Sequence, residues 1–72
     1  MANMNKLRGR IIEAGLSIDD IAESLQINRS TMYRKLADNG LSFTVREVAK
    51  IVNELSLSPD DAFAIFFNHN VA

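Results

Sequence analysis

The chain contains no cysteine and a single histidine, and these shortages exclude several kinds of site. Without thiols it can form neither a disulfide nor a thiolate-bound metal site. His69 has no partner at a spacing that suits metal binding or proton transfer. The paired carboxylates at 19–20 and 60–61 fall where helices are expected to begin, and the helix dipole accounts for them there. We therefore expect no catalytic residue, no metal and no cofactor.

Long apolar runs are also absent. The longest one, AFAIFF, covers only residues 62–67, whereas a membrane span needs about 18 apolar residues. The basic residues near the N-terminus are not followed by an apolar stretch of signal-peptide length. The composition therefore predicts a cytoplasmic protein without membrane contact. The length predicts a single domain, 1–72, with its core at about 5–67; such a small domain gains stability from a partner.

The most informative segment is 17–36, where two short helices are predicted to follow each other closely. The first has an apolar stripe at i, i+3, i+4, i+7 spacing, formed by Ile18, Ile21, Ala22 and Leu25. Asn28 is suited to cap a second helix that begins at about Arg29, with Met32 and Leu36 facing inward. This pattern predicts a helix-turn-helix, the arrangement that places its second helix in the DNA major groove.

The outward face of the second helix carries side chains suited to base recognition. At about 100° per residue, with Met32 and Leu36 turned inward, the outward candidates are Arg29, Ser30, Tyr33 and Arg34. Arginine pairs with guanine, serine serves several base edges, and a tyrosine ring contacts a thymine methyl. Thr31 and Lys35 lie on the flank, where DNA backbone phosphate is the expected contact. A basic helix alone is more commonly a solvated surface, but the preceding helical corner favours DNA binding.

These residues resemble the lambda-repressor-like helix-turn-helix family, the Cro and CI class of phage repressors. The resemblance covers about residues 5–67 and rests on Ala22, Leu25, Ile27, Ser30, Met32 and Leu36. It implies an all-α, five-helix lambda-repressor-like domain that binds operator DNA, usually as a homodimer, in a bacterial host cell. By position it assigns base reading to the four outward residues. The family often has glycine at the first turn position; Gln26 stands here, at a cost of about 1 kcal/mol if the left-handed conformation is kept, so the turn is expected to differ in shape.

The remaining chain supplies the scaffold. The first helix is expected at about 5–14, ending at Gly15, and Gly40 is expected to end the third. Thr44 opens a fourth helix, whose expected core stripe is Val45, Val48, Ala49, Val52 and Leu55. Pro59 is the first residue of a fifth helix. The sequence thus predicts five helices and no strand.

Charge is distributed unevenly along the chain. The net charge is −1, but residues 1–37 hold six basic and four acidic groups, whereas residues 38–72 hold two and five. We therefore expect the DNA-binding face in the N-terminal half, with weak non-specific affinity. By analogy with the family, the loop before the fourth helix lies beside the DNA backbone, which makes Ser42 and Thr44 candidate phosphate contacts. The alternative is that Thr44 only caps its helix.

The fifth helix is more apolar than one core contact requires. Its apolar arc covers about 200°, and Ile51 and Leu57 add to the surplus. The candidate interface residues are Ile51, Leu57, Phe63 and Phe67. Two interpretations remain open: the aromatic residues fill the protein's own core, or they form a dimer or partner interface.

The sequence as a whole predicts a sequence-specific DNA-binding transcriptional regulator, a Cro-like repressor that contacts double-stranded operator DNA through the helix starting near Arg29. The alternative is an antirepressor that binds and inactivates a partner phage repressor as a heterocomplex. A third reading, the antitoxin of a toxin pair, needs a toxin-binding segment for which the chain has little room. An enzyme is the least favoured interpretation.

Overall fold

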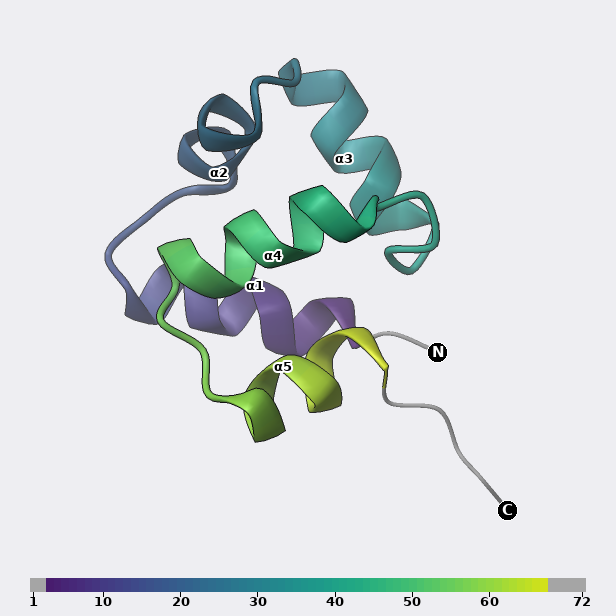
Figure 1. Cartoon of the computed structure of the whole chain (residues 1–72). Coiled ribbons are helices and arrows are strands. Elements are labelled where there is room, and N and C mark those ends of the chain that lie inside the picture. Colours follow the sequence, from purple (N-terminus) through teal and green to yellow (C-terminus); the bar gives the residue numbers. More distant parts are fainter. Residues whose placement is uncertain (1–2, 68–72) are drawn as a thin grey trace.

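The computed structural model describes residues 3–67 of the chain, so His69 lies outside the described residues. It contains five α-helices, α1 (Met4–Glu13), α2 (Ile18–Leu25), α3 (Arg29–Ala37), α4 (Val45–Glu54) and α5 (Pro59–Phe66). No strand occurs between residues 3 and 67. The all-α prediction and the number of helices are therefore confirmed (Figure 1).

Polar residues fix where the helices begin. The five N-cap side chains each accept a backbone N–H, and they are Asn3, Ser17, Asn28, Thr44 and Ser58. Ser17 with Asp20, and Thr44 with Glu47, form reciprocal capping boxes. Caps of this kind satisfy amide groups that have no partner within the helix. Because caps involve residues only three apart, the sequence located these helix starts almost to the residue.

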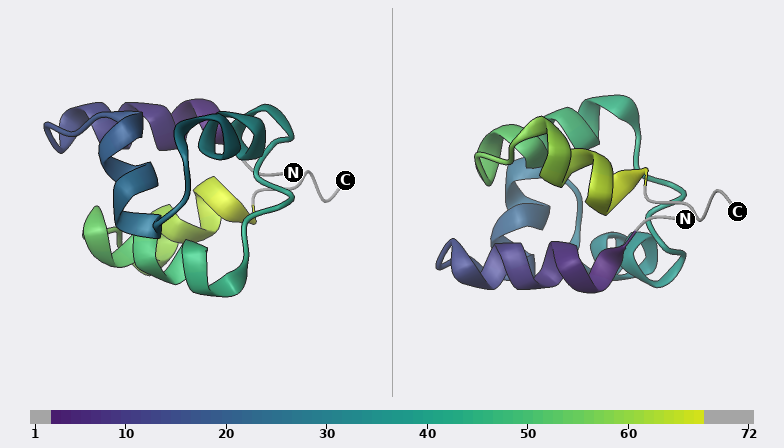
Figure 2. Two further views of the ribbon diagram at one scale, coloured as in Figure 1. Left: turned by 90° about the horizontal axis from the view of Figure 1, so that it is seen from above. Right: turned by 90° about the horizontal axis from the view of Figure 1, so that it is seen from below.

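The helices enclose one core. Figure 1 shows α2 and α3 at one end of the molecule, α5 at the other, and α1 and α4 between them. In both views of Figure 2, α1 lies on one side and α4 and α5 on the other, with α2 crossing between. Every helix contributes at least one fully buried side chain: Leu7, Ile11, Ile21, Met32, Ile51 and Ile65. The core therefore fixes α3 relative to all the other helices.

Two hydrogen bonds join the α1 region to α5. The Asn3 amide donates to the Ile65 carbonyl at 2.6 Å, and the Arg10 guanidinium donates to the Asp61 carboxylate, also at 2.6 Å. The hydrogen bond from Arg10 lowers the pKa of the Asp61 carboxyl. No helix among residues 3–67 is long and apolar enough to cross a membrane.

The structure corrects the predicted packing of the fourth helix. Val45 is 87% exposed and Ala49 is exposed, so neither belongs to the core stripe. Ile51 is fully buried and Leu57 is 8% exposed, so neither lies on a surface that a partner can reach. The apolar arc of α4 is rotated toward Ile51 because the neighbouring helices cover that side, whereas nothing covers the first turn at Val45.

The turn between α2 and α3 keeps the left-handed conformation, contrary to the expected change of shape. Gln26 has φ 60° and ψ 38°, values usual for glycine. The amide of Ile27 donates to the Ala22 carbonyl at 3.1 Å, which closes the turn. A side chain in this conformation costs about 1–2 kcal/mol. Packing around the corner therefore offsets local backbone strain.

Candidate DNA-binding interface

The helical corner formed by α2, the turn and α3 is closed by small and apolar residues. Ala22 is 3% exposed and permits close approach of the two helices, and half-buried Ile27 packs against the core. Asn28 then accepts the Thr31 amide at 2.7 Å and begins α3. The first turn of α3 lies at the outer edge of the molecule (Figure 1). Major-groove binding requires the second helix of the motif, here α3, to lie at the surface in this way.

The structure places the four candidate base-reading residues on the exposed side of α3, as predicted; their contact with bases stays a prediction. They are Arg29, Ser30, Tyr33 and Arg34. The Arg29 guanidinium lies 5.7 Å from the centroid of the Tyr33 ring, and its Nε lies 3.3 Å from Asp19 Oδ1. Both contacts lie on the exposed surface, since the side chains of Arg29 and Asp19 are 72% and 55% exposed.

Ser30 and Arg34 differ in whether the side chain already has a partner within the protein. The Ser30 hydroxyl donates to Asn28 Oδ1 at 3.0 Å, so it must exchange this bond to reach a base edge. The Arg34 guanidinium is exposed and has no ion-pair partner among residues 3–67. Arg34 is therefore the α3 side chain best able to form a bidentate pair with guanine.

Lys35 lies in a different place from the one that the sequence predicts. It was expected on the exposed flank of α3, but it is only 9% exposed. Its ammonium group donates to the Ser42 carbonyl at 2.7 Å and lies 3.2 Å from Glu47 Oε1. A buried charge needs such partners, and they leave Lys35 turned away from solvent. The spacing could have shown this, since Lys35 follows Met32 by three residues and adjoins Leu36 on the inward arc.

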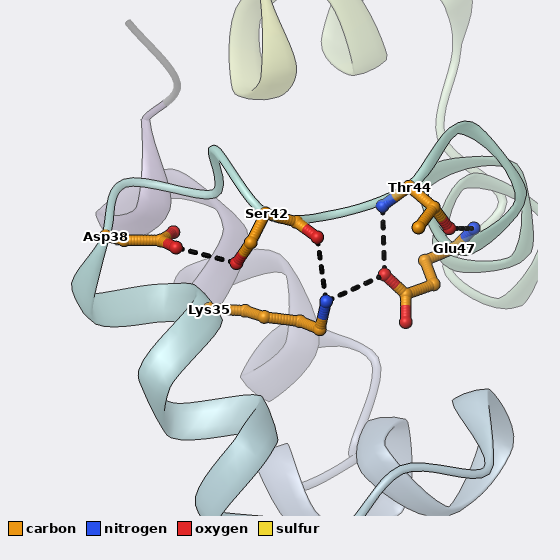
Figure 3. Close-up of polar contacts among 5 residues, drawn as sticks. All are labelled: Lys35, Asp38, Ser42, Thr44 and Glu47. Atoms are coloured by element: carbon orange, nitrogen blue, oxygen red, sulfur yellow. Dashed lines mark hydrogen bonds and ion pairs between the residues drawn. The ribbon is translucent and has the colours of Figure 1, made fainter.

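Ser42 and Thr44 also form hydrogen bonds within the protein (Figure 3). The Ser42 hydroxyl donates to Asp38 Oδ2 at 2.6 Å, and the Thr44 hydroxyl accepts the Glu47 amide at 3.1 Å. The Thr44 amide in turn donates to Glu47 Oε1 at 2.9 Å. Two carboxylates thus accompany the hydroxyl groups that were expected to contact phosphate. This arrangement ties the α3–α4 loop to both helices.

Both carboxyl groups of this network favour the ionised form. The Ser42 hydroxyl bond holds the pKa of Asp38 below its ordinary value. Burial by itself raises the pKa of Glu47, but bonds from the Thr44 amide and the Lys35 ammonium outweigh it, and the net pKa is lowered. Both carboxylates are therefore ionised at neutral pH, and the Lys35 ammonium pairs with the carboxylate of Glu47.

No group of histidine, cysteine or acidic residues suited to a metal ion occurs in the part of the chain that the structure describes. The exposed surface of α3 instead offers hydrogen-bond donors and an aromatic ring, which is the chemistry of base-edge recognition.

The fold and the exposed second helix define a helix-turn-helix DNA-binding domain. Residues 2–39 match the family model for the helix-turn-helix domain of resolvase. The match covers just over half of the chain and contains α1, α2 and α3, so the chain belongs to this family. It supports the helix-turn-helix prediction without selecting the Cro and CI class. Neither curated proteins nor solved structures gave a match.

Proposed function

We propose that the protein is a sequence-specific DNA-binding regulator that inserts α3 into the major groove. The observation that carries this proposal is the exposed Arg34 on a helix whose opposite side is fixed in the core by Met32 and Leu36. Arg29, Ser30 and Tyr33 complete the base-reading set, and Thr31 contacts the DNA backbone beside them. Lys35 is buried and holds α3 against the α3–α4 loop instead of contacting phosphate. Ser42 and Thr44 are exposed and remain candidate phosphate contacts at the start of α4.

The regulator acts by binding and not by catalysis. In a Cro-like mechanism it occupies an operator and excludes RNA polymerase or a competing repressor from the same DNA. Occupancy of this kind needs only a small rigid domain with a projecting helix. The five-helix structure with a single shared core meets that requirement.

The proposal is tested by selecting sites from a random duplex library and then measuring affinity for the selected site. Arg34→Ala should weaken binding by roughly 1–3 kcal/mol and relax the preference at one base pair. Thr31→Ala, which removes a backbone contact, should weaken binding to all sequences by a similar factor. If wild-type protein selects no sequence, or if Arg34→Ala keeps the full preference, α3 does not read bases in this way.

We further propose that the operator-bound form is a homodimer joined through α5. Phe63 is 62% and Phe67 51% exposed, and their ring centroids lie 6.1 Å apart, which makes one continuous apolar surface. Phe66, by contrast, packs edge-on against Phe43 inside the domain. A two-fold contact between α5 helices would pair two α3 helices for half-sites spaced by about 34 Å.

Sedimentation of wild-type protein and of Phe67→Glu tests the dimer. The wild type should be a dimer at micromolar concentration, and Phe67→Glu should be a folded monomer with much weaker operator binding, because two linked half-sites bind more tightly than one. Arg8→Glu, a charge change on an exposed residue of α1, is the control for sedimentation and for operator binding. A wild-type monomer with full operator affinity would refute the dimer.

The same exposed phenylalanines support the second candidate, an antirepressor. Together with the net charge of −1, they suit capture of another regulator better than tight DNA binding by a monomer. In that case the protein should be monomeric and should remove a partner phage repressor from its DNA as a 1:1 complex. Phe67→Glu should abolish this capture without changing the protein's own sedimentation.

A further inference from the structure

The basic side chains that remain available for DNA are not the ones that the charge distribution along the sequence suggests. Three of the eight lysines and arginines are held in ion pairs, namely Arg10, Arg29 and Lys35. The other five have no ion-pair partner among residues 3–67, and two of these, Arg46 and Lys50, belong to the acidic C-terminal half. The N-terminal half therefore offers less positive charge than its composition indicates.

Arg46 and Lys50 lie beside the helix-turn-helix although they are far from it in sequence. Both line an open groove of 860 Å³ that also includes Leu25 and Gln26 at the end of α2. Its remaining lining residues are Ser24, Thr44, Glu47, Ala49 and Asn53. The groove therefore joins α4 to the corner that begins α3.

The charge in this groove is positive. Glu47 is its only acidic residue, and that carboxylate is already paired with the Lys35 ammonium at 3.2 Å. Arg46 and Lys50 are exposed and stand at i, i+4 on α4, so their side chains extend from neighbouring positions about 6 Å apart. Two such cations suit successive phosphates of one nucleic-acid strand.

Helix stability does not explain Arg46. It is the second residue of α4, where the positive end of the helix dipole disfavours a cation. Capping of the same helix is already provided by Thr44 and Glu47. Neither the dipole nor capping therefore accounts for the charge of Arg46 at this position.

We propose that Arg46 and Lys50 bind the DNA backbone, so that α4 forms a second part of the DNA interface beside the α2–α3 turn. The inference rests on the proposed function and adds to it a contact that is independent of base sequence. Both residues lie outside the matched segment 2–39, so the family assignment gives them no role. Their contribution is to affinity, whereas Arg34 on α3 supplies specificity.

The test measures binding of the full chain to a mixed-sequence DNA duplex of about 30 base pairs over a series of salt concentrations. Arg46→Gln and Lys50→Gln keep helix propensity and remove one charge each. Each should weaken binding about 3- to 10-fold and reduce the slope of log affinity against log salt by about 1. Arg46→Lys and Lys50→Arg should retain wild-type slopes. Thermal unfolding checks that the variants fold.

Arg8→Gln is the matched control, because Arg8 is an exposed residue of α1 without an ion-pair partner in the described range 3–67. It should leave affinity and slope unchanged. If it weakens binding as much as Lys50→Gln does, the effect comes from net charge and the groove has no special role. If wild-type protein binds its selected site with Arg34-dependent preference while the Arg46 and Lys50 variants keep the wild-type slope, this inference fails and the proposed function stands. If wild-type protein binds no duplex, both fail.

Discussion

Replacing Lys35 by methionine tests whether its ammonium group holds α3 against α4. Methionine keeps the unbranched stem beside Phe43 and removes the bonds to the Ser42 carbonyl and the Glu47 carboxylate. Glu47, whose side chain is 15% exposed, then retains only its Thr44 partners. Because the packing is kept, the difference in stability between this variant and the wild type measures what the ammonium group of Lys35 contributes.

The expected loss is large for so small a domain. A hydrogen bond to a charged group contributes about 1.5–3 kcal/mol, and partial solvent access at Glu47 together with the retained packing lowers the expected cost to about 1–2 kcal/mol. For a domain of 60–100 residues, 1 kcal/mol corresponds to about 4–8 °C in Tm. Lys35→Met should thus melt roughly 4–16 °C below wild type, as measured by circular dichroism at one fixed protein concentration.

A double-mutant cycle with Glu47→Gln separates the pair from other effects. The double variant should be more stable than the two single losses predict, with a coupling of about 0.5–1.5 kcal/mol.

Lowering the pH gives an independent check of the Lys35–Glu47 pair. Because the pKa of folded Glu47 is below its ordinary value of 4.5, its contribution is complete above that value and is lost as the pH falls through the folded pKa. The difference between wild type and Lys35→Met should therefore shrink in acid. A coupling indistinguishable from zero, or a difference that does not depend on pH, would show that the Lys35–Glu47 pair does not stabilise the domain.

Three backbone substitutions give further predictions, all checked by urea unfolding. Gln26→Gly should stabilise the domain by about 0.5–1 kcal/mol, since glycine adopts φ 60° without strain; a loss would mean that the glutamine side chain has a packing role. Gly40→Ala should destabilise by about 1–2 kcal/mol, because φ is +76° and the added Cβ would lie 3.0 Å from Met4 Cε. Gly9→Ala is the matched opposite: it lies in α1 with nothing within 4 Å of the added Cβ, and should stabilise by about 0.5–1 kcal/mol.

The sequence alone determined the local structure. Asn28 and Thr44 cap their helices where expected, and α5 begins at Pro59 as predicted, because a helix start is decided by residues within three positions of one another. The outward placement of Arg34 also followed from spacing, since Met32 and Leu36 fixed the buried side of α3. Helix periodicity of this kind needs no knowledge of the neighbouring elements.

Only the tertiary structure decided which helix faces are buried and which charged side chains form ion pairs. The partners of Lys35 were decided by the tertiary structure, because Glu47 and the Ser42 carbonyl come from a later part of the chain, and the contacts of α2 with both α3 and α4 bring them together. The burial of Ile51 and the 87% exposure of Val45 depend in the same way on where the other helices lie. Arg46 reaches the groove beside the turn through the contact of α2 with α4, which joins residues about twenty positions apart in the sequence. Such contacts are set by the shared core, and no local pattern in the sequence encodes them.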